Sequence, residues 1–158
     1  MNAPVVTKMC SVAEFCALRE SLRDSAQSDR SSGKQQILVC FGGSCLASGA
    51  KEVRDALRSA LEGEKLADQV ALVETGCMGP CVVGPVVMMG EDRTFYQGVK
   101  PGDAVDIVKQ HVCGGKRVER LLVSDAAGKR PAPCRQDIEF FKRQTQIVLR
   151  NCGWIDPE

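Results

Sequence analysis

Apolar and polar positions in the first part of the chain follow a helical pattern that gives way to a polar stretch. Residues 11–26 begin with a Ser-x-x-Glu capping pattern and then repeat apolar side chains at helical spacing, which predicts an amphipathic helix. Residues 27–33 are polar and have nothing to bury, so we expect a linker there.

The middle of the chain alternates between short apolar runs and an amphipathic segment. The runs at 36–40 and 70–75 predict buried strands. Between them, residues 48–61 carry apolar side chains on one face and charges on the other, which predicts a helix with Ser48 as its N-cap. We read this order as one strand, a crossover helix and a second, parallel strand.

The next segments complete a small sheet. An apolar run from about Val86 and the segment 94–99 predict two antiparallel strands joined by a turn. Residues 101–112 then predict a helix that ends at two glycines and buries Val105, Val108 and Val112. This order predicts an α/β protein with a thioredoxin-like fold, in which flanking helices pack on a small mixed four-stranded sheet, with helical extensions at both ends of the chain.

Two cysteine pairs stand directly after the predicted strands. Cys40 and Cys45 form a C-x4-C pair, and Cys77 and Cys81 form a C-x3-C pair. Each pair can offer two thiolates to one metal centre, and four soft ligands suit zinc or an iron-sulfur cluster. The chain has one histidine, His111, far from both pairs, which argues against a Rieske-type centre.

The residues within the loops favour a cluster over a single ion. Gly42, Gly43 and Gly79 let the backbone approach a multi-atom anionic group closely. Zinc knuckles more often use the tighter C-x2-C spacing. A zinc-stabilised structural or interaction module with the same four cysteines stays open as the alternative, and elemental analysis separates the two.

Composition and charge exclude several other classes of function. The 21 basic and 20 acidic side chains nearly cancel, and aromatic residues are few, so we expect no binding to nucleic acid. The sequence shows no export signal and no apolar run of membrane-spanning length, so we expect no membrane insertion and a cytoplasmic location. In that reducing compartment, nine cysteines indicate metal ligands rather than disulfides.

The cysteine spacing and the element order together resemble a known family. Cys40-x4-Cys45 and Cys77-x3-Cys81, with Gly-x-Cys-x-Gly-Pro-Cys at the second pair, look like the thioredoxin-like [2Fe-2S] ferredoxin family over residues 35–115. The resemblance implies that these four cysteines hold one [2Fe-2S] cluster, two per iron, and that the domain moves single electrons.

The last part of the chain resembles a particular relative of these ferredoxins. Residues 117–122 and 140–153 look like the junction in NADH-binding flavoprotein subunits of NAD(P)-linked hydrogenases and complex I-like diaphorases. That likeness implies partners in a multi-subunit redox complex, including a flavin or iron-sulfur electron partner, and a homo-oligomer is possible. We therefore expect three parts: an N-terminal helix and linker (1–34), the ferredoxin domain (35–115), and a linker and helix (116–158).

The chain departs from that pattern because it lacks the motifs of the flavin core. It has no glycine-rich loop for FMN or NAD(H) and no C-x2-C-x2-C run for a [4Fe-4S] cluster. We expect those cofactors only in a missing remainder of the subunit and identify no catalytic residues here, so enzymatic activity is undecided. A free-standing ferredoxin that kept the junction is the alternative to a fragment.

Two further readings remain for the chain as a whole. A dithiol enzyme of the thioredoxin type needs a reactive C-x-x-C, which this sequence lacks. A regulatory or assembly role for the terminal segments is compatible with a cluster. We assign no role to five cysteines and treat them as bystanders: Cys10, Cys16, Cys113, Cys134 and Cys152.

Overall fold

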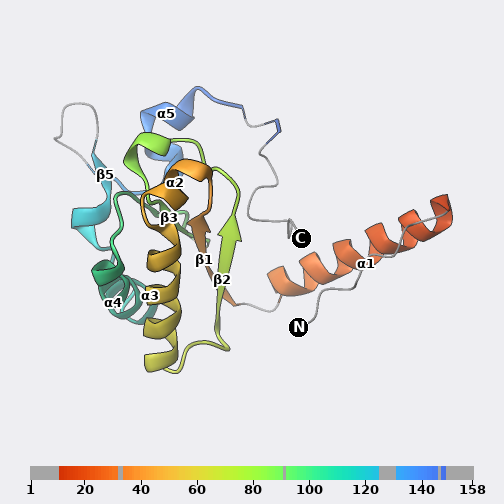
Figure 1. Ribbon diagram of the computed structural model, residues 1–158, viewed down its shortest axis with the longest axis horizontal. Coiled ribbons are helices and arrows are strands. Elements are labelled where there is room, and N and C mark those ends of the chain that lie inside the picture. Colours follow the sequence, from red (N-terminus) through yellow and green to blue (C-terminus); the bar gives the residue numbers. More distant parts are fainter. Residues whose placement is uncertain (1–10, 32–33, 91, 125–130, 146, 149–158) are drawn as a thin grey trace. The chain divides into compact units, whose positions relative to one another are not determined.

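The computed structural model describes residues 11–31, 34–90, 92–124, 131–145 and 147–148 (Figure 1). These residues fall into two units, one within residues 1–34 and the other within residues 35–153. Each unit is described by itself.

The first unit contains the helix α1 (Val12–Ser31). The predicted capping box is present, because the backbone N–H of Glu14 donates to Ser11 Oγ and that of Ser11 donates to Glu14 Oε2, each at 3.2 Å. The predicted linker is wrong for residues 27–31, where the helix continues. Adding a residue to a helix that has already formed costs little free energy, and a polar sequence without Gly or Pro does not end the helix. Residues 32–33 lie outside the described residues.

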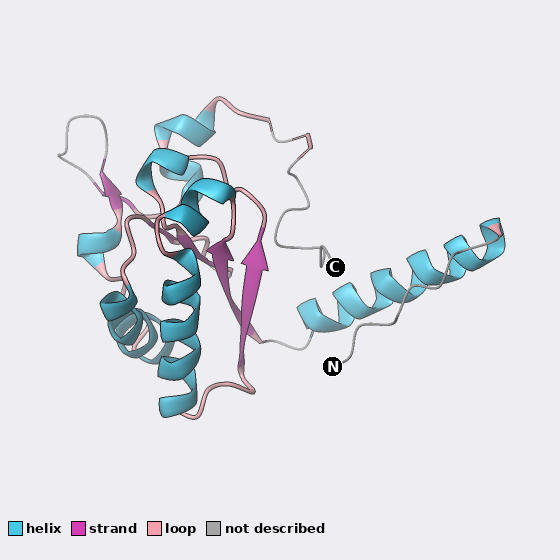
Figure 2. Cartoon of the chain, viewed as in Figure 1, coloured by secondary structure: helices cyan, strands magenta, loops and turns pink. Residues whose placement is uncertain are grey.

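The second unit is built on a mixed four-stranded sheet in the order β2-β1-β3-β4. Central β1 pairs with β2 in parallel and with β3 antiparallel, and β3 pairs with β4 antiparallel. Figure 2 shows these strands in magenta among the helical segments. The predicted parallel unit and hairpin are confirmed, although β4 is shorter than predicted. The strands are β1 (Gln35–Cys40), β2 (Val70–Thr75), β3 (Val87–Met89) and β4 (Phe95–Tyr96).

The crossover between β1 and β2 contains two helices instead of one. A short helix α2 (Gly43–Ala47) precedes α3 (Ala50–Gly63). Ser48 is therefore the C-cap of α2, and the predicted N-cap is wrong. The N-cap of α3 is Gly49, whose φ of +96° suits a residue without a side chain at this sharp change of direction. Of the apolar face predicted for this helix, Val53, Leu57 and Leu61 are buried and Ala60 is partly buried, and Ala50 is buried in addition.

The predicted helix at 101–112 forms, but it is not a regular α-helix. It begins with a 3-10 turn (Pro101–Asp103), continues as α4 (Ala104–Asp106) and widens into a π-helical segment (Ile107–Cys113). Its buried residues keep helical spacing, but they lie on a stripe one position away from the predicted one. Val108 is buried as predicted and Val112 is partly buried, but Val105 is 48 % exposed, contrary to the prediction, and Ala104 and Ile107 are buried as well.

The described residues 116–124 and 131–142 continue the packed unit, contrary to the linker predicted there. Backbone bridges join Thr94 to Cys134 and Tyr96 to Leu122, so this segment extends the sheet edge at β4. Leu121, Leu122 and Ile138 contribute to the hydrophobic core. The segment contains β5 (Val123–Ser124), β6 (Pro131–Ala132) and α5 (Glu139–Lys142), with 3-10 turns at Glu119–Leu121 and Arg135–Asp137.

Within the described ranges, no helix combines the length and the apolar character that a membrane crossing requires.

Candidate metal centre

The parallel pairing of β1 and β2 brings the two cysteine pairs to one edge of the sheet. Cys40 is the last residue of β1, and its partner in the register is Thr75, the last residue of β2. Cys77 follows Thr75 by two positions. Because parallel strands end at the same edge, both cysteine loops leave the sheet side by side, near α2 in Figure 1.

The first pair is buried. Cys40 is 2 % exposed, and Cys45, which lies on α2, is 1 % exposed. The Cys40 thiol lies close enough to Cys45 to raise the pKa of the Cys45 thiol. Cys40 Sγ also lies 3.7 Å from the carbonyl oxygen of Gly76, at the start of the second loop. The first pair is therefore held inside the core and already touches the loop that carries the second pair.

The second pair is closer to solvent. Cys77 Sγ lies 3.4 Å from Cys81 Sγ, with Cys77 half-buried and Cys81 exposed. The loop turns at Gly79, whose φ is +121°, and the Cys81 N–H donates to the Gly79 carbonyl at 2.8 Å. Ser44 Oγ donates to the Cys81 carbonyl at 3.2 Å, which ties α2 to this loop.

The two pairs share one small pocket, and two glycines allow the loops to meet. A Cβ at Gly42 would lie 3.1 Å from Cys77 Cβ, and a Cβ at Gly84 would lie 2.7 Å from Cys45 Sγ. Both contacts are tighter than ordinary van der Waals distances, so a larger residue at either position would push the loops apart. The pocket is lined by the four cysteines and by Met78, Gly79, Pro80 and Val86.

The four sulfurs reach one pocket from two segments of the chain. In the part of the chain that the structure describes, no three His, Cys, Asp or Glu side chains converge on one ion-sized site. Within the second pair the sulfurs lie 3.4 Å apart, and the Cys45 thiol interacts with Cys40 and also with Cys81. Two thiolate pairs that face one pocket fit a centre of two metal ions with two thiolates each, as in a [2Fe-2S] cluster.

Without a cation, the site opposes ionisation of its own thiols. Burial, the hydrogen bond to Cys40 and the charge of Cys40 raise the pKa of Cys45 to about 12. The hydrogen bond to Cys77 and the charge of Cys77 raise the pKa of Cys81. Bound metal reverses this balance, because its positive charge stabilises the thiolates and metal binding releases their protons. The donor set is therefore suited to a cationic core.

His111 does not belong to this site and is not the solvated cation that its place in the sequence suggests. Its side chain is 11 % exposed, and Nδ1 lies 2.7 Å from the Tyr96 hydroxyl. The Val118 N–H donates to the same hydroxyl at 3.1 Å, and His111 Nε2 lies 3.5 Å from Asp92 Oδ2. This network joins the π-helical segment, β4 and the chain after Gly115, so its role is structural.

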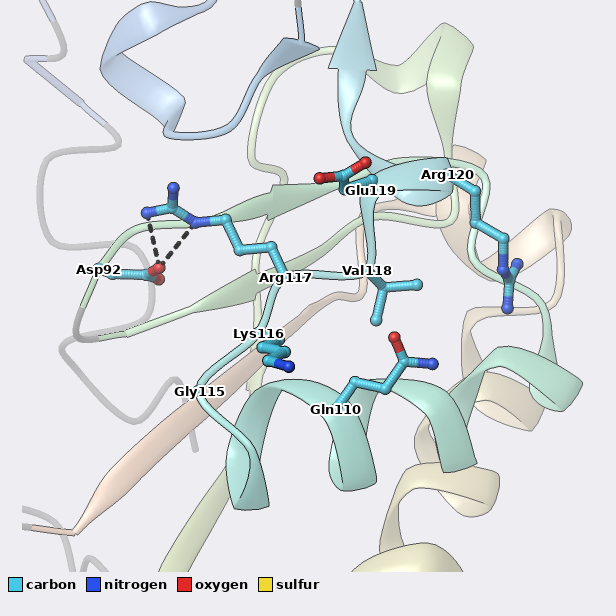
Figure 3. Close-up of a pocket in the computed structure, with 8 residues that line it drawn as sticks. All are labelled: Asp92, Gln110, Gly115, Lys116, Arg117, Val118, Glu119 and Arg120. Carbon is cyan, nitrogen blue, oxygen red and sulfur yellow. Dashed lines mark hydrogen bonds and ion pairs between the residues drawn. The ribbon is translucent and has the colours of Figure 1, made fainter.

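A polar pocket lies beside this network (Figure 3). Arg117 donates from Nε and Nη2 to Asp92 Oδ2 at 3.1 and 3.0 Å. Burial raises the pKa of Asp92, but hydrogen bonds from Thr94 and Arg117 and the nearby His111 outweigh it, so that pKa is lowered overall. In Figure 3 the Arg117 guanidinium points toward Asp92. Their ion pair holds the segment after Gly115 against the turn between β3 and β4.

The other cysteines that the structure describes do not line this pocket. Cys113 is exposed, Cys134 is half-buried with Arg117 Nη2 3.7 Å from its sulfur, and Cys16 is part-buried on α1. Cys10 and Cys152 lie outside the described residues. Spacing alone therefore identified the four cysteines that share a pocket. It did not identify Gly84, because the requirement for glycine there comes from Cys45 on another segment.

Comparisons with known proteins were made for sequence and for structure. A family model described as thioredoxin-like [2Fe-2S] ferredoxin matches residues 25–112. A protein named "Ferredoxin, 2Fe-2S" from Aquifex aeolicus is 40% identical over 90 residues, which cover 56% of this chain and 79% of the relative. Another of that name from Clostridium pasteurianum is 31% identical over 94 residues, which cover 60% of this chain and 86% of the relative.

Solved structures agree with the sequence relatives. The wild-type thioredoxin-like [2Fe-2S] ferredoxin from Aquifex aeolicus superposes with a TM-score of 0.54 at 33% identity, covering 58% of this chain and 98% of that one. A second structure of a ferredoxin from this organism gives 0.55 at 36% identity, covering 62% and 96%. These neighbours confirm the thioredoxin-like fold, and they do not favour the zinc alternative. The chain therefore belongs to the thioredoxin-like [2Fe-2S] ferredoxin family, with a single [2Fe-2S] cluster through which it transfers electrons.

Proposed function

We propose that Cys40, Cys45, Cys77 and Cys81 hold the [2Fe-2S] cluster, with one pair bound to each iron. The observation that carries this proposal is the register of β1 and β2, which brings both thiol pairs to one pocket. When bound, such a cluster takes up and returns one electron, and its formal charge changes from about −2 to about −3.

The two cysteine pairs differ in their exposure to solvent. Cys40 and Cys45 lie in the core, where water is excluded and the sulfurs are fixed by packing. The other side is open: Cys81 is exposed, and the adjacent Val82 is 95 % exposed. Leu46, next to Cys45, is 43 % exposed. We propose that an electron partner approaches this open side, which Cys81 and Val82 form.

Serine substitution tests the ligand assignment. Each of Cys40→Ser, Cys45→Ser, Cys77→Ser and Cys81→Ser should lower iron and sulfide per chain and alter or abolish the EPR signal of the reduced protein. Cys113→Ser is the matched control, because Cys113 is exposed and does not line the pocket. If all four variants keep the wild-type spectrum and iron content, the assignment is wrong.

We further propose that this ferredoxin works within an NAD(P)H-linked oxidoreductase or hydrogenase complex in the cytoplasm. The support is the resemblance of residues 117–122 and 140–153 to the junction that precedes a flavin core. In such a complex, the partner is a subunit or domain that contains flavin or iron-sulfur clusters, and the chain itself relays electrons without catalysing their removal from the nucleotide.

The redox complex can be tested with the protein purified from its own cells under anaerobic conditions. The preparation is treated in turn with NADH, NADPH, hydrogen and dithionite, and the cluster is followed by EPR. Reduction by a nucleotide or by hydrogen, together with flavin in the preparation, supports the proposal. A flavin-free preparation whose cluster responds only to dithionite contradicts it.

A further inference from the structure

The segment after β6 places two aromatic rings directly on the second cysteine loop. A Cβ built at Gly79 would meet Phe140 Cε1 at 3.2 Å and Phe141 Cε1 at 3.3 Å. Both rings therefore lie in contact with the middle of the Cys77–Cys81 loop. In Figure 1, α5 lies at the end of the sheet where α2 is found, which is the end that carries the cysteines.

The rings are fixed by the sheet and by each other. The Phe95 N–H on β4 donates to the Pro133 carbonyl at 2.9 Å, which anchors the chain just before α5. The Phe141 ring packs edge-to-face on Phe95 at 5.7 Å and on Phe140 at 5.0 Å between centroids. The Arg135 guanidinium covers the Phe141 ring at 4.5 Å. The cover over Gly79 is therefore an ordered part of the fold.

This aromatic cover lies outside the residues that the family model matches. The match ends at residue 112, whereas the rings belong to α5 at Glu139–Lys142. The contact with Gly79 is thus made by a segment added to the ferredoxin domain.

We propose that Phe140 and Phe141 are positioning residues that exclude water from the Cys77–Cys81 loop and thereby keep the reduction potential of the cluster low. The inference rests on the proposed ligand set. Solvent exposure helps to set the potential of an iron-sulfur centre. The reduced form has the larger negative charge, so water stabilises it more than the oxidised form. A dry aromatic surface against the loop therefore disfavours reduction.

The cover is one-sided, which leaves a route for electron exchange. The first pair is enclosed by the core, and the aromatic rings cover the second loop at Gly79. Cys81 and Val82 remain exposed beyond the rings. Different residues therefore control the reduction potential of the cluster and the access of an electron partner. Removal of the rings should change the potential and leave Cys81 and Val82 exposed.

Three variants test this role on the holoprotein. Phe140→Ala removes a ring that is 48 % exposed, and Phe141→Leu keeps apolar volume but removes the ring edge that meets Gly79. The third variant combines both. Val105→Ala is the matched control, because Val105 is also 48 % exposed and lies on α4, well separated from α5 in Figure 1. The midpoint potential is measured by anaerobic EPR-monitored titration, and hydrogen-deuterium exchange is measured for a peptide spanning residues 76–84.

We expect an upward shift of the midpoint potential and faster exchange of the loop in both single variants, with the largest changes in the double variant and none in Val105→Ala. An unchanged potential overturns the proposal, whether or not loop exchange accelerates, and so does a raised potential without faster loop exchange. Failure of the ligand assignment is a separate result, because it appears as a wild-type spectrum and iron content in the serine variants of all four cysteines.

Discussion

Gly84→Ala is the substitution for which the structure predicts the clearest effect on the metal centre. The backbone at Gly84 has φ −69° and ψ 163°, which any residue adopts, so the cost is steric and not conformational. The added Cβ would lie 2.7 Å from Cys45 Sγ, whereas ordinary contacts are about 3.5–4.0 Å. Cys45 is 1 % exposed, so its sulfur can move only toward the pocket that the four cysteines line, away from its position as a proposed ligand.

Overpacking of this kind costs about 1–3 kcal/mol. For a chain of this size, each kcal/mol lowers the melting temperature by roughly 2–4 °C, so we expect a decrease of roughly 2–12 °C. Iron per chain should fall as well, because the sulfur that has to move is one of the proposed ligands. The assay is an anaerobic thermal melt by circular dichroism, with iron and sulfide counted on the same sample.

Gly43→Ala is the matched control, since it makes the same chemical change two residues before Cys45. A Cβ at Gly43 meets nothing within 4 Å, and the position is the first residue of α2. Alanine there should be neutral or stabilise the protein by about 0.4–1 kcal/mol. A Gly84→Ala protein that melts at or above the wild-type temperature with full iron content would refute the steric reasoning and the placement of Cys45.

Further predictions concern the structural network and the thiols. Tyr96→Phe removes the hydroxyl that accepts the buried Val118 N–H, so the free energy of unfolding in urea should fall by about 1–3 kcal/mol, and an unchanged midpoint would contradict the network. The pKa of Asp92 is lowered in the folded protein, so its stabilisation is complete above its ordinary pKa of 3.8 and is lost as pH falls through the folded value. Unfolding at pH 6 and pH 3 should therefore show a smaller acid-induced loss in Asp92→Asn than in wild type, and equal losses would refute this. In the metal-free protein at pH 8, iodoacetamide should label Cys45 at least ~100-fold more slowly than exposed Cys113, because a pKa of about 12 leaves little thiolate at Cys45. Mass spectrometry measures both labelling rates, and equal rates would contradict this prediction.

The parts of the fold that could be predicted are those whose pattern is local and continuous. β1, β2 and α3 each carry an uninterrupted apolar run or stripe, and their order determines the parallel pairing that brings Cys40 and Cys77 together. The cysteine pairs were recognisable because the two members of each pair stand a few residues apart, a spacing typical of metal ligands in one loop. No such regularity marks α2, which begins at glycine and exposes Leu46.

The missed features depend on contacts between segments that are distant in sequence. His111 is buried because Tyr96 and the chain at Val118 cover it, and nothing within its own helix indicates that. The apolar residues after Gly115 are few and scattered, so the sequence there resembles a linker. Its bridges to the edge of the sheet at β4 depend on a segment that is distant in sequence. Phe140 and Phe141 likewise gain significance only from their contact with Gly79.

The parallel pairing of β1 with β2 also has a consequence for the time course of cofactor insertion. Cys40 and Cys45 are neighbours in the chain and come together early, whereas Cys77 and Cys81 arrive only after the crossover through α3 has closed. Such non-local pairing is slow compared with helix formation. Until it is complete, the chain offers half of the proposed cluster site, and its second pair of thiols remains open to oxidation. A variant that delays docking of β2 should therefore accumulate oxidised, iron-free protein even when its final folded state is as stable as wild type.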